Sequence, residues 1–284
     1  MTKITLKYII LNFLKNALDW YLRQIELPSP ELPTVDEGVK LKTIALSKTK
    51  DNSKITYKSA IARPLARQSD PADIAKKLAQ YCQQQWVGDC SSNTPQISQK
   101  PGFLRAHLEV KVVPPGLLLF ELTDSGMAAW LQYFCEELPL SVVEEDLPFL
   151  VAEHLFKIQY SHARCCSLLR IADAVFPIPI SWQETDGKLR LNHPGERHLI
   201  SQIFSTWDLL YFPTATPEEI NWQKVATALS EAFQNFYGQC RILGEVKIEN
   251  PELAKARLGL ILISKYLLQF LLEKKLKIKA PTEL

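Results

Sequence analysis

Tyr160 and Arg164 combine an aromatic ring with a guanidinium group at a spacing of four residues. In a helix this spacing is just over one turn, so both side chains lie on the same face. Such a pair can stack on an unpaired base and bind a phosphate group. It can equally stabilise a protein core, with the guanidinium satisfied by internal partners. The two residues alone leave both interpretations open.

The element that positions this pair is predicted to be a helix. Apolar residues recur near helical spacing at Ile158, Cys165, Leu168 and Ala172, and no glycine or proline interrupts the segment before Pro177. A second helix is predicted over 221–237. A third, over residues 251–275, is apolar on nearly every side and should run through the middle of a bundle.

Three motifs in this half resemble the anticodon-binding (DALR) domain of arginyl-tRNA synthetases. Tyr160-Ser-His-Ala-Arg164 followed by Ser167-Leu-Leu-Arg170 resembles the helix that opens that domain. The segment 230–241 resembles its Phe-Tyr-x-x-Cys helix, and residues 256–281 resemble its closing helix and tail. The resemblance implies an all-α bundle over roughly residues 147–284.

In that family the positions matching Tyr160, Arg164 and Tyr237 line a site for anticodon bases, through ring stacking and guanidinium contacts. Lys157 stands where the family favours an aromatic residue, and an ammonium group can bind a phosphate but cannot stack. The resemblance therefore implies a tRNA-binding surface, and retention of these residues for the fold alone is the alternative. The candidate tRNA-binding residues are Lys157, Tyr160, Arg164, Tyr237, Arg241, Arg257 and Lys265.

The first half of the chain has the pattern of a small α/β domain. Residues 108–113 and 117–122 alternate like strands on either side of a Pro-Pro-Gly turn. Asp70 and Pro71 form a well-defined helix start. The segment Pro115–Leu122 and the residues Ala129-Trp-Leu131 resemble the extra N-terminal domain of arginyl-tRNA synthetases, an α/β sandwich that touches the tRNA elbow in the family. Leu119 stands where that family usually has Asn.

The expected organisation is an α/β domain over residues 1–136, a linker over 137–148, and a helical anticodon-binding-like domain over 149–284. The linker is acidic and contains prolines. A nucleotide-binding catalytic domain needs well over ~100 residues, and the His-x-Gly-His and Lys-Met-Ser-Lys-Ser signatures of this synthetase class do not occur in the sequence. The sequence is therefore similar to an arginyl-tRNA synthetase that lacks its catalytic domain, and we expect no enzymatic activity.

Composition constrains the remaining possibilities. The chain has 284 residues and a formal net charge of only +2, so any nucleic-acid surface must be a local patch. Its six cysteines include no C-x-x-C pair, which indicates a reducing cytosol without zinc. His193 and His198 are five residues apart across Pro194-Gly195, which disfavours a metal site. We expect no cofactor, no metal and no membrane span, and a cytoplasmic location.

The leading hypothesis is a non-catalytic tRNA-binding protein, with an arginine-accepting tRNA as the first candidate ligand. One alternative is an accessory subunit that supplies tRNA recognition to a synthetase or a tRNA-modifying enzyme. The other is a protein-interaction module that has lost RNA binding, which the nearly neutral net charge, Leu119 and Lys157 would permit.

Overall fold

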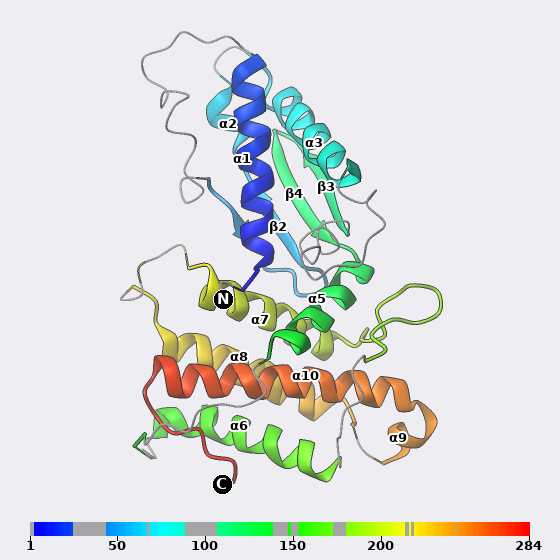
Figure 1. Ribbon diagram of the computed structural model, residues 1–284, viewed down its shortest axis with the longest axis vertical. Coiled ribbons are helices and arrows are strands. Elements are labelled where there is room, and N and C mark those ends of the chain that lie inside the picture. The colour runs from blue at the N-terminus through cyan, green and yellow to red at the C-terminus, as the bar shows by residue number, and fades with distance from the viewer. Residues whose placement is uncertain are drawn as a thin grey trace. The chain divides into compact units, whose positions relative to one another are not determined.

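The computed structural model describes residues 3–24, 44–66, 69–88, 107–138, 147–148, 153–172, 180–213, 216, 219–242 and 244–284 (Figure 1). Contacts divide the chain into two compact units, residues 1–126 and residues 127–284. The first unit is an α/β domain and the second is helical, which confirms the predicted fold class.

The first unit is built on a four-stranded antiparallel sheet in the order β1-β2-β4-β3. Its strands are β1 (Ser47–Lys48), β2 (Thr56–Ser59), β3 (Leu108–Val113) and β4 (Leu117–Leu122). Leu118, Phe120 and Leu122 alternate with more exposed neighbours, so one face of β4 is buried. The helices of this unit are α1 (Leu6–Gln24), α2 (Ala62–Leu65) and α3 (Pro71–Gly88), and α3 packs against both α1 and the sheet (Figure 1).

Gly116 joins β3 to β4 and fixes how closely this hairpin approaches α3. Its φ of +90° lies in the left-handed region. A Cβ atom at this position would lie 2.6 Å from the backbone oxygen of Pro71, the first residue of α3. Both the conformation and the close approach therefore require glycine at the predicted turn.

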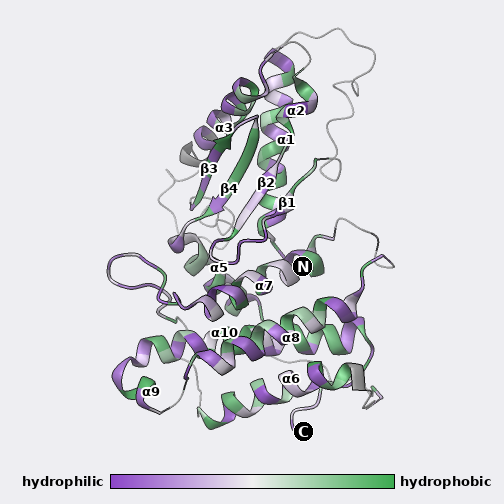
Figure 2. Cartoon of the chain, turned by 180° about the vertical axis from the view of Figure 1, so that it is seen from behind, coloured by the Kyte–Doolittle hydropathy of each residue, from purple (hydrophilic) through white to green (hydrophobic). Residues whose placement is uncertain are grey.

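The second unit is a bundle organised around one long helix. Its helices are α5 (Asp124–Glu137, which begins three residues before the unit does), α6 (Glu153–Ile171), α7 (Pro194–Tyr211), α8 (Trp222–Gln239), α9 (Glu245–Glu249) and α10 (Pro251–Phe270). A short π-helix, Leu271–Lys275, continues α10. As predicted, α10 lies in the middle, in contact with α6, α7 and α8. Figure 2 shows hydrophilic and hydrophobic residues alternating along α6 and α8, as expected for helices with one buried face.

The division of the chain by contacts falls ten residues before the predicted domain end at residue 136. The physical reason is the aromatic packing of α5 on α7. The ring centroid of Trp130 lies 5.9 Å from that of Phe204, and those of Phe134 and Trp207 are 4.5 Å apart. Most of α5 therefore belongs to the core of the second unit. Most of the predicted linker, 137–148, lies outside the described residues.

Candidate nucleic-acid interface

The helices α6 and α8 are held in a fixed register by small polar residues. The hydroxyl oxygens of Ser161 and Ser230 are 2.7 Å apart, and the Ser230 hydroxyl also donates to the backbone oxygen of Lys157 at 3.0 Å. Gln234 donates to the Ser161 hydroxyl at 2.9 Å. Because buried polar groups form hydrogen bonds in preferred geometries, this network fixes which residues face each other across the two helices.

Arg164 lies one turn after Ser161 on α6 and Tyr237 lies two turns after Ser230 on α8, and the two side chains meet although they are far apart in the sequence. The guanidinium carbon of Arg164 lies 4.8 Å from the centroid of the Tyr237 ring, and the guanidinium also donates to the Tyr237 hydroxyl. The Tyr237 ring in turn stacks on buried Phe233, with centroids 6.2 Å apart and ring planes 14° apart. Both members of the contact are half-buried. The guanidinium group is therefore held in one orientation before any ligand arrives.

Tyr160 lies one turn before Arg164 on α6, and 43% of its surface is exposed. Its ring stacks with that of Phe156, at a centroid distance of 6.1 Å and an interplanar angle of 26°. Phe156 is 47% exposed. We call Phe156 and Tyr160 the aromatic pair. The sequence analysis missed Phe156, although its spacing of four residues from Tyr160 was a signal that could have identified it.

Lys157 lies beside the aromatic pair but is bound to a carboxylate. Its ammonium nitrogen is 2.8 Å from a carboxylate oxygen of Glu231 on α8, and both side chains are exposed. A phosphate group that approaches Lys157 therefore meets an ammonium group whose charge is already partly compensated.

Arg257 lies in a different environment from the aromatic pair. Its guanidinium is 2.7 Å from the carboxylate of Glu196 on α7, and the two side chains are only 11% and 1% exposed. The same carboxylate accepts a hydrogen bond from the backbone N–H of His193, which caps α7. Arg257 also donates to the backbone oxygen of Arg241. These contacts give Arg257 a role in the fold, and its assignment to an RNA-binding surface stays a prediction.

Arg241 and Lys265 are placed separately from one another. The Arg241 guanidinium is exposed just after α8 and forms a long ion pair of 3.8 Å with Glu245. Lys265 is half-buried on α10, where its positive charge acts on His162 and Cys166 of α6. Of the seven candidate residues, the structure brings Arg164 into contact with Tyr237, and Arg257 into contact with the backbone of Arg241. Tyr160 and Lys157 lie within two turns of Arg164 on α6.

The opposite side of α6 binds the C-terminal tail. The imidazole Nδ1–H of buried His162 donates to the backbone oxygen of Pro281 at 2.7 Å, and its Nε2 faces the Cys166 sulfur at 3.8 Å. Burial lowers the pKa of His162 to about 4, and the positive charge of Lys265 acts in the same direction. His162 is therefore a neutral structural group that holds the tail against α6.

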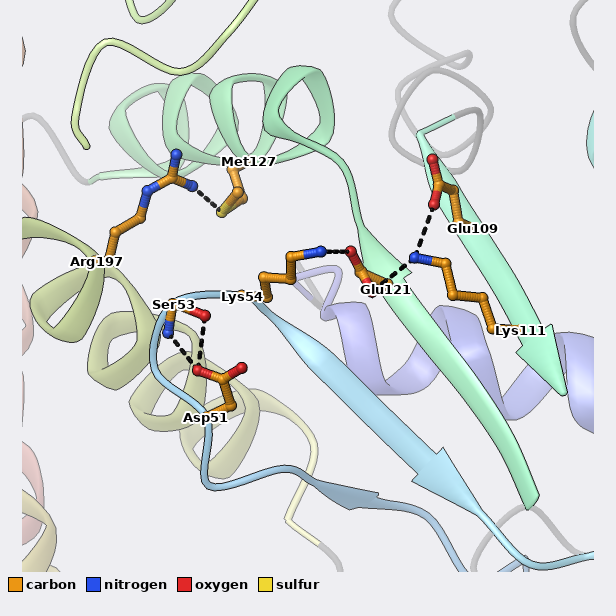
Figure 3. A network of polar contacts seen from close by, with 8 residues as sticks. All are labelled: Asp51, Ser53, Lys54, Glu109, Lys111, Glu121, Met127 and Arg197. Carbon is orange, nitrogen blue, oxygen red and sulfur yellow. Dashed lines mark hydrogen bonds and ion pairs between the residues drawn. The ribbon is translucent and has the colours of Figure 1, made fainter. Parts of the chain in front are cut away.

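The exposed face of the sheet in the first unit carries lysines that are also bound to acids (Figure 3). Lys111 lies between Glu109 and Glu121, at 3.2 Å and 2.9 Å, and Glu121 also binds Lys54. Burial raises the pKa of Glu121, but the hydrogen bonds from Lys54 and Lys111 outweigh it, so its pKa lies below the ordinary value. This network favours internal charge compensation rather than a strongly basic surface.

The described ranges contain no group of three or more His, Cys, Asp or Glu side chains placed to hold a metal ion. None of the helices in those ranges is long and apolar enough to cross a membrane. The Nδ1 atom of His193 accepts a hydrogen bond from the Gly195 backbone N–H at the start of α7.

A helical bundle that presents an aromatic pair and an oriented guanidinium on one face has the features of a domain that binds unpaired nucleotides. Residues 158–284 match the family of the DALR anticodon binding domain, which is the particular resemblance that the three sequence motifs predicted.

Individual proteins similar to this chain are arginine–tRNA ligases. The chain is 35% identical to an arginine–tRNA ligase of Synechococcus sp. over 130 residues, which cover 44% of this chain and 21% of that protein. It is 34% identical to the arginine–tRNA ligase of Moorella thermoacetica (38% and 18%), and 31% identical to that of Desulfitobacterium hafniense (54% and 27%). The chain thus matches about a fifth to a quarter of the length of these relatives. No solved structure matches it.

Proposed function

We propose that this protein binds tRNA without catalysing a reaction on it, and that the surface between α6 and α8 contacts unpaired bases. The observation that carries the proposal is the contact of Arg164 with Tyr237 beside the exposed ring of Tyr160. An oriented guanidinium next to exposed rings can bind one nucleotide through its base and its phosphate.

The local charge of this surface supports the proposal, although the whole chain is nearly neutral. The cations of α6 are Lys157, Arg164 and Arg170, and Glu231 is the only acidic residue within α8. Acids bind Lys157 and Arg170, whereas Arg164 contacts the ring and hydroxyl of Tyr237. The charge that attracts a phosphate group to this surface is therefore mainly that of Arg164, which is held by an aromatic residue rather than by an acid.

The absence of catalysis is part of the proposal. The similarity to arginine–tRNA ligases covers a limited part of their length, and the matched family is an anticodon-binding domain. The sequence also lacks the two signatures by which such ligases are expected to hold ATP. Because the relatives are arginine–tRNA ligases, an arginine-accepting tRNA is the first ligand to test, and a synthetase or tRNA-modifying enzyme is the first kind of protein partner.

The test is binding of unfractionated tRNA by the full chain and by Arg164→Ala, measured by filter retention at low and at moderate salt. We expect the wild-type protein to bind and the variant to bind at least about tenfold more weakly, because a charged contact that is already oriented is lost. Thermal unfolding of both proteins checks that the fold is kept. Failure of the wild-type protein to retain tRNA even at low salt would reject the proposal and favour a protein-interaction module.

A further inference from the structure

Two exposed cations of α6 are bound by acids that come from other elements. Lys157 binds Glu231 of α8 at 2.8 Å, and Arg170 binds Glu283 of the C-terminal tail at 2.9 Å. All four side chains in these two ion pairs are exposed to solvent. Neither pair is a neighbour pair within one helix, so the fold itself brings each acid to its cation.

The two pairs lie before and after Arg164 along α6, and Arg170 lies toward the side of the helix on which the tail binds. Thirteen residues separate Lys157 from Arg170, which is about 20 Å along a helix. Arg164 lies between them, and its guanidinium contacts the ring and hydroxyl of Tyr237 rather than a carboxylate. Arg164 is thus held by an aromatic residue, and Lys157 and Arg170 are each held by an acid.

A carboxylate and a phosphate are alternative ligands for the same cation. Both present oxygen acceptors to an ammonium or a guanidinium group, and arginine binds either one through two parallel hydrogen bonds. Exposed ion pairs contribute little to stability, so exchanging the carboxylate for a phosphate costs the fold little. An acid placed on such a cation therefore competes directly with an RNA phosphate.

We propose that Glu231 and Glu283 occupy, in the free protein, the positions at which two RNA phosphates bind to Lys157 and Arg170. This inference rests on the proposed function, because it concerns the regulation of the same surface. RNA binding then replaces two carboxylates by two phosphates, and the two acids keep the affinity for RNA low. Specificity shifts toward ligands that also engage the aromatic pair and Arg164, because phosphate contacts alone are weakened.

The test compares the wild-type protein with Glu231→Gln, Glu283→Gln and the double variant, using unfractionated tRNA over a series of salt concentrations. Glutamine keeps the size of each side chain and removes its charge. We expect about threefold tighter binding for each single variant and about tenfold for the double variant at low salt. We also expect the slope of log affinity against log salt to steepen by about 0.7 for each released cation.

Glu252→Gln is the matched control. Glu252 forms an exposed ion pair with Lys255 on α10 at the same distance of 2.8 Å, so this variant makes the same charge change elsewhere in the second unit. It should bind tRNA as the wild-type protein does. If the Glu231 and Glu283 variants bind no more tightly than Glu252→Gln, the inference is wrong while the proposed function stands. Loss of tRNA binding in every protein, including the wild type, overturns both.

A second variant tests whether the tighter tRNA binding expected for Glu231→Gln depends on Lys157. Lys157→Gln should weaken binding more in the Glu231→Gln background than in the wild-type background, because only there is the ammonium group available without exchange. Equal losses in the two backgrounds would mean that Glu231 does not compete for Lys157.

Discussion

Arg164 and Arg257 both carry a guanidinium in the helical unit and both were expected to contact RNA, yet the structure surrounds them differently. Arg164 rests on the ring of Tyr237 at a half-buried position beside exposed aromatic residues. Arg257 binds Glu196, whose carboxylate is almost completely buried. A guanidinium on an aromatic ring keeps its charge available to an outside anion. A guanidinium on a buried carboxylate is already neutralised, so its contribution is to the fold.

The largest effect is expected for a substitution of Arg257, on the free energy of unfolding. Arg257→Ala would leave the Glu196 carboxylate buried without its counter-charge, and we expect a loss of about 3–5 kcal/mol in the free energy of unfolding. Urea unfolding followed by circular dichroism measures this loss. The double variant Arg257→Met/Glu196→Met should lose less, because it leaves no unpaired charge and gives up mainly the cap of α7. A stable Arg257→Ala protein with weakened tRNA binding would instead return Arg257 to the RNA surface.

The environment also decides the charge of His162, which lies on the far side of α6 from Arg164 and is neutral in the folded protein. Because burial holds its pKa at about 4, below the ordinary 6.5, the unfolded chain binds a proton between these values and the folded protein does not. Stability must therefore fall as the pH is lowered from about 6.5 toward 4, by about 3 kcal/mol in total.

The measurement is the free energy of unfolding at pH 7 and at about pH 4.5, for the wild-type protein and for His162→Gln. Burial also lowers the pKa of His107 in the first unit, but this contribution is present in both proteins and cancels in the difference. We expect the wild-type protein to lose about 2–3 kcal/mol more than the variant over this range. Equal losses would show that His162 is protonated in the folded state and does not hold the tail as a neutral donor.

The contrast between the two arginines also shows what the sequence could not predict. Local patterns identified the helix that carries Tyr160 and Arg164, the strands around Gly116 and the central position of α10, because periodicity and turn residues act over short distances. The partners of the charged groups were not predictable in this way. Glu196 precedes Arg257 by 61 residues, and only the packing of α7 on α10 brings them together.

The sequence likewise predicted some residues of the candidate surface but not their contacts. The motif resemblance pointed to Tyr160, Arg164 and Tyr237, and the assignment of these residues to RNA stays a prediction. The family pattern places an aromatic residue at position 157, where this chain has Lys157. Phe156, which helical spacing places one turn from Tyr160, was therefore not predicted. The pairing of Lys157 with Glu231 also depends on the register of α6 against α8, which is set by serine contacts that have no sequence signature.

Of the three effects compared here, for Arg257, His162 and Tyr160, the smallest is expected at Tyr160, one turn from Arg164. Tyr160→Ala removes one of the two exposed rings of the aromatic pair, and we expect tRNA binding to weaken by about 1–3 kcal/mol, the usual range for one stacked base. Tyr8→Ala is the matched control, because Tyr8 lies on α1 of the first unit and is 41% exposed, close to the 43% of Tyr160. Since stacking carries no charge, Tyr160→Ala should leave the salt dependence of binding unchanged, whereas Arg164→Ala should make it shallower. A shallower slope for Tyr160→Ala would mean that this ring acts by orienting Arg164 rather than by stacking on a base.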